Sequence, residues 1–286
     1  MESSTPWICI NGEWTRESII PAGNRSFLYG DGLFETMRTI GTDVVFFDRH
    51  IERLHWGMGQ LELPIIKILQ SDSIKEMVVS LIHKNKWYSG ARVRLNVYRE
   101  STGRYTPIED HTGFLLNGEP MHLQPFYPFT GTGKLLTLYS ELRKPLNMIS
   151  TLKTTSSIFY VLAGKFARAN GYDDAFCLNM NGDIIESVNS NVFVITDKQV
   201  IAPGPEQGAL DGTMRKQMLL LLRDQGFEIE ECGISDQDLS NADEVLLTNA
   251  VQGINWVKGY KDRRYFHRVG LELSNKLNLL IENRSF

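Results

Sequence analysis

The stretch LNMISTLKTTSSIFYVLAGKFARANG, residues 146–171, places one lysine, Lys153, directly before a predicted helix. The helix is expected over 156–170, with Gly171 as the residue that ends it. No acidic residue stands within nine positions of Lys153. A lysine amine becomes reactive when burial or a nearby positive charge lowers its pKa, but on position alone a solvated surface lysine is the simpler interpretation.

A second distinctive residue, Glu186, stands in GDIIESVNSNVFVI, residues 182–195. Apolar, strand-forming residues on both sides favour its burial. A buried carboxylate needs a positive or protonated partner, and the nitrogen of a pyridinium ring is one candidate. The alternative is an ordinary solvated or ion-paired carboxylate at a strand end.

Length and composition indicate a globular protein. The chain has 286 residues, of which 42% are apolar and 22% charged, and its formal net charge is −4. This length suits one large domain or two of medium size. The small net charge gives no electrostatic basis for binding nucleic acid or an anionic membrane.

The sequence indicates neither a membrane span nor a signal peptide. It contains no apolar run of 18 residues, and MESSTPWICINGEW lacks a basic segment followed by an apolar one. We therefore expect a cytoplasmic protein. Cys9, Cys177 and Cys232 are widely spaced, which predicts neither a disulfide framework nor a metal site.

The first 120 residues are predicted to form an α/β domain. Hairpins are expected at Asn11–Gly12 and Gly41–Thr42, because these residues suit tight turns between alternating segments. Helices are expected over 49–63, with Asp48 as N-cap, and over 71–86. Residues 90–100 alternate between apolar and polar side chains, which is typical of a strand with one buried face.

Residues 117–133 are rich in proline and glycine, which indicates a domain boundary, and residues 121–133 are predicted to be the interdomain linker. Residues 134–286 are then expected to form a larger, β-rich domain with helices. Its pattern predicts strands over 134–142, 173–202 and 242–260, and a helix near the C-terminus. The fold class is therefore predicted to be two-domain α+β.

The segment ALDGTMRKQMLLLL, residues 209–222, predicts a helix that begins near Gly212 and Thr213. Unpaired N–H groups and the positive end of the helix dipole can bind a phosphate there. A plain helix start with Asp211 as N-cap is the alternative. The segment is not a P-loop, because the lysine and the hydroxyl residue of that motif are missing.

Four motifs in order along the chain resemble the fold-type IV pyridoxal-phosphate enzymes, the class IV aminotransferases. They are YGDGLFETMR at 29–38, LK at 152–153, ESVNSNVF at 186–193 and LDGTMR at 210–215. The resemblance extends over roughly residues 7–257. One such motif is weak evidence for the family, but four motifs in the family's order are strong evidence for it.

The resemblance implies that Lys153 holds pyridoxal 5′-phosphate as a Schiff base and moves the substrate's α-proton. It implies that Glu186 faces the nitrogen of the cofactor ring, with Ser187 in place of the family's usual glycine. Further cofactor contacts are expected from the helix and turns that match the family's phosphate-binding segments. These residues are Arg53, Asn189, Ser190, Thr213, Met214, Thr248 and Asn249.

The substrate pocket gives mixed indications. Four residues match pocket positions of branched-chain aminotransferases, namely Tyr29, Phe34, Arg38 and Arg94. Arg104 is a further candidate for a carboxylate contact, because segments that include 98–107 look more like aminodeoxychorismate lyases. Arg99 is another, because it aligns with an arginine of the D-amino-acid aminotransferases. The tyrosine that branched-chain enzymes carry five residues after the lysine is replaced by Ile158. D-Amino-acid aminotransferases have a histidine where this chain has Ser101.

The predicted function is transfer of an amino group between a branched-chain-like or D-amino acid and a 2-oxo acid. The alternative is a 4-amino-4-deoxychorismate lyase, which releases pyruvate and 4-aminobenzoate. A third possibility is a catalytically inactive protein with the same fold. The presence of Lys153, Glu186 and Arg53 argues against it, because an inactive protein has no chemical reason to keep all three. The resemblance also implies a homodimer, whose sites are completed by the partner subunit.

Overall fold

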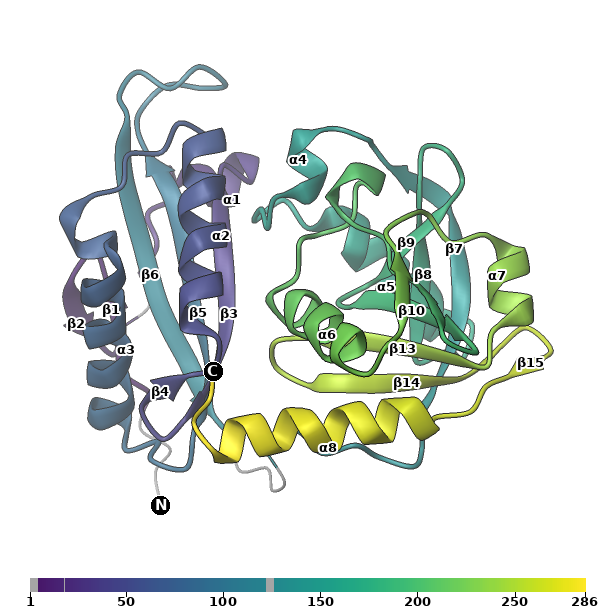
Figure 1. The fold of residues 1–286 in the computed structure, drawn as a ribbon. Coiled ribbons are helices and arrows are strands. Elements are labelled where there is room, and N and C mark those ends of the chain that lie inside the picture. The colour runs from purple at the N-terminus through teal and green to yellow at the C-terminus, as the bar shows by residue number, and fades with distance from the viewer. Residues whose placement is uncertain (1–4, 18, 122–125) are drawn as a thin grey trace. The chain divides into compact units, whose positions relative to one another are not determined.

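The computed structural model describes residues 5–17, 19–121 and 126–286. It contains two compact units, each described separately below (Figure 1). Unit 1 comprises residues 1–122 and 153–156, and unit 2 comprises residues 123–152 and 157–286. The predicted linker over 121–133 lies partly outside the described residues. The contacts group residues 153–156 with unit 1, whereas the sequence suggested one continuous domain over 134–286.

Unit 1 is built around one antiparallel sheet with the strand order β2-β1-β6-β5-β3-β4. Its strands are β1 (Ile8–Ile10), β2 (Glu13–Thr15), β3 (Gly32–Ile40), β4 (Asp43–Val44), β5 (Ala91–Glu100) and β6 (His111–Pro120). Its helices are α1 (Arg25–Tyr29), α2 (Phe47–Gln60), the short 3₁₀ helix η1 (Lys67–Leu69) and α3 (Ser71–Asn85).

The local predictions for unit 1 agree with this arrangement. Asn11 and Gly12 both have positive φ angles and connect β1 to β2, as expected of a tight hairpin turn. Gly41, with φ of +58°, begins the turn from β3 to β4. Helix α2 begins at Phe47, however, so Asp48 lies in its first turn and is not its N-cap.

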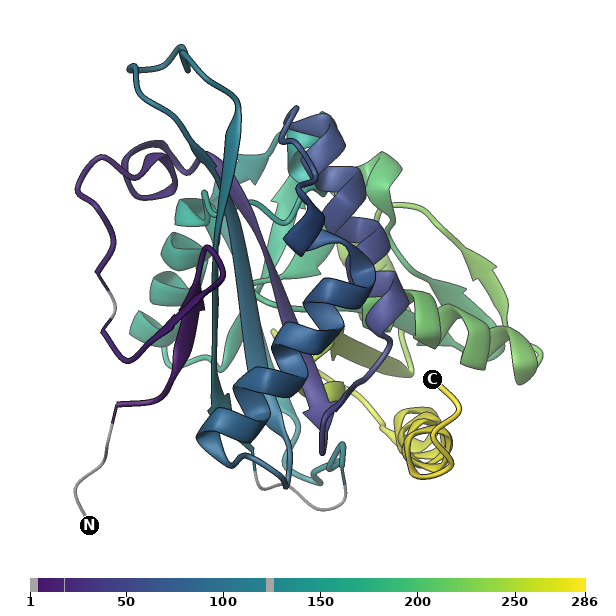
Figure 2. The ribbon, with the colours of Figure 1, turned by 90° about the vertical axis from the view of Figure 1, so that its left-hand side faces the viewer.

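One face of the unit 1 sheet is covered by α2 and α3, which lie side by side in Figure 2. Alternation along β3 and β5 directs apolar side chains to this face, and these pack beneath the apolar stripes of the helices. The residues buried here include Leu33, Met37, Val93, Leu95, Val97, Ile51, Leu54, Met58, Ile74, Val78 and Leu81. The core of unit 1 therefore lies between the sheet and these two helices.

The segment 153–156 runs along the free edge of β3 near its beginning. The Phe34 N–H donates to the Lys153 carbonyl at 2.9 Å, and the Thr155 N–H donates to the Gly32 carbonyl at 2.9 Å. Leu33 and Thr154 form an antiparallel bridge between these bonds. The backbone of Lys153 is thus fixed to a core strand of unit 1.

Unit 2 is larger and contains a strongly curved sheet. Its strands are β7 (Lys134–Lys144), β8 (Asp174–Asn179), β9 (Ile184–Ser187), β10 (Asn191–Thr196), β11 (Gln199–Ile201), β12 (Glu228–Glu230), β13 (Glu244–Asn249), β14 (Gly253–Tyr260) and β15 (Arg263–Arg264). Its helices are α4 (Met148–Thr151), α5 (Ile158–Ala169), η2 (Pro205–Gln207), α6 (Thr213–Asp224), α7 (Asp236–Asn241) and α8 (Arg268–Glu282).

The sheet of unit 2 closes on itself because β9 pairs with both β8 and β10. The strands β10, β13, β14, β7, β8 and β9 thereby form a barrel-like sheet with an apolar interior. Helix α5 packs outside β7 and β8, whereas α6 and α8 pack on β13. As predicted, α5 ends just before Gly171, whose φ is +78°.

Candidate active site

Strand register in unit 2 places Glu186, Asn191 and Thr248 in one row on the outside of the barrel. Asn191 of β10 lies directly opposite Glu186 of β9 on one side and Thr248 of β13 on the other. Residues directly opposite each other in antiparallel strands share one face of the sheet. Two strand spacings, about 10 Å, therefore separate the backbones of Glu186 and Thr248.

Glu186 is buried, and donors from three elements hold its carboxylate. The Lys144 ammonium, at the end of β7, donates to Oε1 at 2.5 Å, and the Tyr160 hydroxyl of α5 donates to the same oxygen at 2.7 Å. The Leu210 N–H donates to Oε2 at 3.0 Å. A carboxylate can accept about four hydrogen bonds, so Oε2 can accept one more from a ligand.

Ser187, which stands where the family has glycine, has a specific polar contact. Its hydroxyl donates to the buried Asp174 carboxylate at 3.1 Å, and the Val188 N–H donates to the other Asp174 oxygen, also at 3.1 Å. Burial raises the pKa of Asp174, although Lys134 and these hydrogen bonds act in the opposite direction. These contacts fix the backbone immediately after Glu186.

At the other end of the row, Thr248 has an unsatisfied hydroxyl. Its side chain is 1% exposed, and within the described part of the chain its Oγ1 has no hydrogen-bond partner. Helix α6, which packs on β13, begins at Thr213 without a side-chain cap on its N–H groups. A buried, unpaired hydroxyl beside an uncapped helix N-terminus fits an anion such as phosphate.

Asn191 connects the two ends of the row through the loop before α6. Its Nδ2 donates to the Leu210 carbonyl at 2.7 Å, while the Leu210 N–H binds Glu186. A Cβ atom at Gly212 would lie 2.0 Å from Asn191 Oδ1, so only glycine fits there without displacing Asn191. The position of Glu186 and the start of α6 are therefore linked by hydrogen bonds.

The other predicted cofactor contacts of unit 2 lie around this row. Thr213 and Met214 form the first turn of α6, and both are buried. Asn249 follows Thr248 on β13, and its Nδ2 donates to the Ser190 hydroxyl at 3.1 Å. The Ser190 hydroxyl in turn donates to the exposed Asn189 side chain at 3.0 Å. Their contacts with a cofactor stay predictions.

In unit 1, Arg53 belongs to a buried polar cluster on the helix-covered face. Its Nε donates to Glu35 Oε1 at 2.8 Å and its Nη2 donates to Oε2 at 2.6 Å. His50 Nδ1 lies 2.7 Å from the same carboxylate. Burial alone would raise the pKa of Glu35, but the charge of Arg53 and the hydrogen bonds of His50 and Arg53 lower it to about 2. Glu35 thus orients Arg53, whose expected phosphate contact stays a prediction.

Lys153 and Arg94 flank the Phe34 ring in the same unit. The Arg94 guanidinium lies 3.7 Å from the ring centroid, and the Lys153 ammonium lies 4.5 Å from it. Phe34 points to the sheet face opposite Glu35, because neighbouring residues of β3 alternate. Lys153, at the strand edge, therefore lies beside the face that carries Phe34 and Arg94.

Arg94 is half-buried and forms no ion pair with any carboxylate of the described residues. Its Nε donates to the Asn96 side chain at 2.9 Å. Burial and, to a smaller degree, the charge of Arg92 lower the pKa of Arg94. A desolvated guanidinium without a protein counter-ion is well suited to bind a substrate carboxylate.

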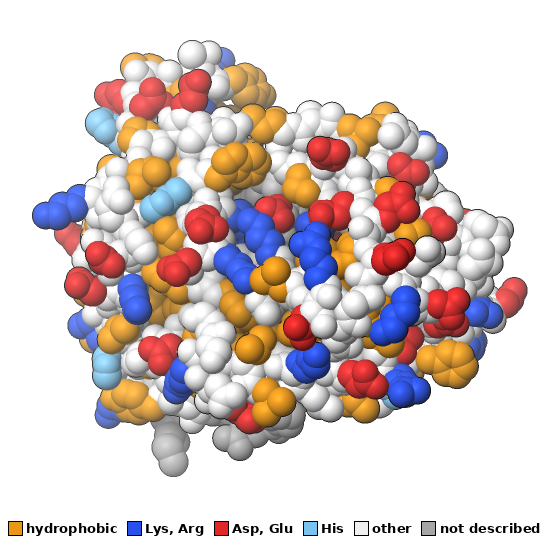
Figure 3. All heavy atoms as spheres, viewed as in Figure 1, with side chains coloured by type: hydrophobic (Ala, Val, Ile, Leu, Met, Phe, Trp, Pro, Cys, Tyr) orange, Lys and Arg blue, Asp and Glu red, His pale blue; other side chains and the backbone are white. Residues whose placement is uncertain are grey.

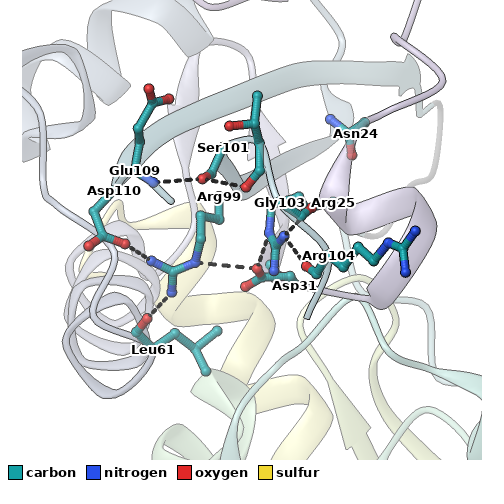
Figure 4. A network of polar contacts seen from close by, with 12 residues as sticks. Asn24, Arg25, Asp31, Leu61, Arg99, Ser101, Gly103, Arg104, Glu109 and Asp110 are labelled. Carbon is teal, nitrogen blue, oxygen red and sulfur yellow. Dashed lines mark hydrogen bonds and ion pairs between the residues drawn. The ribbon is translucent and has the colours of Figure 1, made fainter. Parts of the chain in front are cut away.

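Arg99 holds unit 1 together locally, as Figure 4 shows. Its guanidinium donates to Asp31 at 3.3 Å, to Asp110, and to the carbonyl oxygens of Leu61 and Glu62. The guanidinium N–H groups of Arg99 are therefore bound to protein groups, and its substrate contact stays a prediction. These contacts connect the β5–β6 hairpin to the chain after α2.

Arg104 is exposed on the β5–β6 hairpin, and its side chain extends away from this network in Figure 4. Its carbonyl accepts a hydrogen bond of 2.6 Å from Arg25. Tyr105 lies on the same hairpin, and its ring centroid is 5.5 Å from that of Tyr29 in α1. Arg38 is 2% exposed and directly opposite Arg92 across β3 and β5. Substrate contacts by Tyr29, Arg38 and Arg104 stay predictions.

The sequence pattern of the amino-transferase class IV family matches residues 32–260, which is most of the chain. The chain belongs to the class IV aminotransferases. The predicted family, the two-domain fold-type IV architecture and the pyridoxal-phosphate cofactor are thereby confirmed. The buried Thr248 hydroxyl, the uncapped start of α6 and the open acceptor position on Glu186 fit this cofactor.

Named relatives of this class IV aminotransferase have two activities. An aminodeoxychorismate lyase from Vibrio harveyi is 26% identical over 244 residues, covering 84% of this chain and 87% of the relative. The branched-chain-amino-acid aminotransferase of Escherichia coli K12 is also 26% identical, over 261 residues covering 88% and 84%. Sequence identity therefore does not favour one activity over the other.

Among solved structures, a branched-chain aminotransferase from Thermoproteus uzoniensis with norvaline is similar, with a TM-score of 0.86. The match covers 96% of this chain and 94% of that one at 20% identity, which shows a shared fold.

No helix in the described ranges is long and apolar enough to cross a membrane. On the face in Figure 3, acidic and basic side chains are interspersed, and the described residues contain no metal-binding cluster.

Sequence reasoning did not find Lys144, Tyr160, Asn191 or Leu210. Lys144 and Glu186 are 42 residues apart, and no local pattern connects them. The position of Asn191 follows from the register of three strands, which is set only when β9 closes on β10. The single available indication was that Asn191 lies within ESVNSNVF, one of the four motifs that resemble the family.

Proposed function

We propose that this enzyme transfers an amino group between an amino acid and a 2-oxo acid. The observation that carries the proposal is the Phe34 ring, flanked by the Lys153 ammonium and by an Arg94 guanidinium that pairs with no carboxylate among the described residues. A carboxylate on Arg94 would place an amino or 2-oxo acid beside the Lys153 amine. The family assignment supports the same chemistry.

Each role that the family resemblance implies has a residue in one of the two units. When bound, pyridoxal phosphate withdraws electrons from the substrate carbon whose C–H bond breaks. In unit 1, Lys153 Nζ would hold the cofactor and move the substrate proton, and Arg53 would contribute to phosphate binding. In unit 2, Glu186 Oε2 would accept a hydrogen bond from the ring nitrogen. Thr248 Oγ1 and the first N–H groups of α6 would contribute to phosphate binding there.

A half-reaction experiment tests the transferase activity. With an amino acid alone, the absorbance of the bound cofactor should change to that of pyridoxamine phosphate, because no acceptor returns the amine. Adding 2-oxoglutarate should restore the original spectrum. L- and D-amino acids are compared in parallel, since the sequence leaves the handedness of the substrate open.

The alternative function is cleavage of 4-amino-4-deoxychorismate into pyruvate and 4-aminobenzoate. It is favoured by the Vibrio harveyi relative and by Ile158, which stands where branched-chain aminotransferases have a tyrosine. A lyase needs no amino acceptor, so the cofactor spectrum should return unaided while pyruvate accumulates. Stoichiometric pyruvate, with no spectral conversion by any amino acid, would replace the transferase proposal with this one.

Arg94→Ala is expected to raise KM for the carboxylate substrate about 10²-fold, because a bidentate guanidinium–carboxylate contact is lost. Arg92→Ala is the matched control. Arg92 lies two residues away on the same face of β5, but it pairs with the exposed Glu119 at 3.2 Å. Steady-state kinetics of both variants test the assignment, and equal KM values for Arg94→Ala and wild type would contradict it.

We also propose that the active enzyme is a homodimer. Both units expose large apolar side chains, and such residues commonly mark interaction surfaces. In unit 1 they include Phe27, Leu28, Tyr29, Tyr105 and Ile108; in unit 2 they include Met148, Ile149, Ile158, Val161 and Leu162. Sedimentation equilibrium should give twice the chain mass of 32.6 kDa. A monomer with full activity would exclude the dimer as a requirement.

A further inference from the structure

The Glu186 carboxylate is paired with a buried protein cation. The side chains of Glu186 and Lys144 are 4% and 8% exposed, and their charged atoms lie 2.5 Å apart. Glu186 is the sole carboxylate that Lys144 contacts in the described ranges. Glu186, the residue expected to face the cofactor ring, therefore already has a positively charged partner in the protein.

Burial keeps the other titratable groups around Glu186 neutral. Burial and, after it, the charge of Glu186 raise the pKa of Tyr160 well above its ordinary value, so the phenol stays protonated. Burial raises the pKa of Cys177, opposite Glu186 on β8, in the same way. Lys144 is thus the cation that balances the Glu186 charge in unit 2.

We infer that Lys144 is a positioning residue that pairs with the Glu186 carboxylate and orients it before the cofactor binds, and afterwards shares this carboxylate with the ring nitrogen. The inference rests on the proposed role of Glu186 toward the cofactor. The geometry supports sharing, because Lys144 and Tyr160 both bind Oε1 while Oε2 accepts only the Leu210 N–H in the described ranges.

Sharing has a measurable consequence. If Lys144 is removed, Glu186 loses its counter-charge in the cofactor-free protein, and a buried carboxylate without a partner is destabilising. The protonated ring nitrogen supplies a positive charge to the same carboxylate, so bound cofactor should compensate for the missing lysine. A purely structural ion pair, remote from the cofactor, would not be compensated in this way.

The test compares melting temperatures of cofactor-free and cofactor-loaded protein for wild type and Lys144→Met. Cofactor-free Lys144→Met should melt roughly 5–10 °C below wild type. Saturating pyridoxal phosphate should recover most of this difference. The cofactor-induced rise in melting temperature should therefore be larger in Lys144→Met than in wild type, and Lys144→Arg should behave like wild type.

Lys134→Met is the matched control, because Lys134 lies on the same strand and its ammonium is 3.8 Å from the buried Asp174 carboxylate. This variant should lose the same stability with and without cofactor. If Lys144→Met does not fold, Lys144→Gln is used, because glutamine can still donate a hydrogen bond to Glu186. The cofactor-induced rise in melting temperature should then still be larger in Lys144→Gln than in wild type, but by less than in Lys144→Met.

Two results would overturn the inference, and they are distinguishable. An equal cofactor-induced rise in wild type and in the Lys144 variant would make the ion pair purely structural, with the proposed function intact. If wild type takes up no pyridoxal phosphate and shows no thermal shift, the proposed function fails and this inference fails with it.

Discussion

Replacing Lys153 with alanine is expected to abolish turnover, with a fall in kcat on the order of 10⁴-fold or more. The Lys153 amine is assigned two tasks, covalent attachment of the cofactor and transfer of the substrate proton. Proton transfer by a positioned group alone contributes about 10²–10⁴-fold, and loss of the covalent step adds to this. The characteristic visible absorbance of the attached cofactor should disappear together with the activity.

The fold should survive this substitution. Lys153 is fixed to β3 through its backbone carbonyl, which alanine retains, and the Thr155 N–H bond to Gly32 is unaffected. We therefore expect a melting temperature of the cofactor-free protein close to that of wild type. A loss of activity in a folded variant then reports on the amine itself.

Lys165→Ala is the matched control, because Lys165 is an exposed lysine of the helix that follows. It should keep wild-type activity and absorbance. Borohydride reduction followed by peptide mass spectrometry locates the attachment point directly and should find the cofactor on Lys153. Modification of a different lysine in wild-type protein would disprove the assignment, whatever the activity of the variants.

The parts of the fold that could be predicted depend on interactions between near neighbours in sequence. The turn at Asn11–Gly12 follows from two residues that tolerate positive φ, and strand β5 follows from its alternating side chains. The start of α2 could not be predicted as well. Asp is a common N-cap residue, but the N-cap is Phe46, with its left-handed backbone, so the helix begins two residues before the predicted start.

Candidate site residues could be proposed from the sequence only where a family motif marks them. Lys153, Glu186 and the start of α6 stand in such motifs, whereas Lys144 stands in none. Its contact with Glu186 depends on β7 and β9 both pairing with β8. Arg99 differs from Lys144, because a family resemblance does mark its position and predicts a substrate contact. In the structure its N–H groups bind Asp31, Asp110 and backbone carbonyls, which no local pattern indicated.

Replacing Glu186 with glutamine is expected to lower kcat by about 10²–10³-fold, the effect typical of removing one electrostatic partner of a developing charge. A neutral amide cannot hold the ring nitrogen protonated, so less of the negative charge left on the substrate carbon can be withdrawn into the ring. The dissociation constant of the cofactor should change much less, because the phosphate contacts and the covalent attachment are retained.

This variant has a second effect that must be separated from the first. In Glu186→Gln the buried Lys144 ammonium loses its counter-charge, and breaking one side of a buried ion pair costs about 3–5 kcal/mol. The double variant Glu186→Gln/Lys144→Met removes both charges. It should regain much of the lost stability while its kcat remains as low as that of Glu186→Gln.

Single-turnover measurements at saturating cofactor give the decisive comparison, because they report on proton removal rather than on cofactor binding. A slow rate in both Glu186 variants, despite their different stabilities, would assign the effect to the missing carboxylate. A double variant that regains both stability and rate would show instead that Glu186 acts only as the partner of Lys144. In that case another group would have to face the ring nitrogen, and the electrostatic role assigned to Glu186 would be wrong.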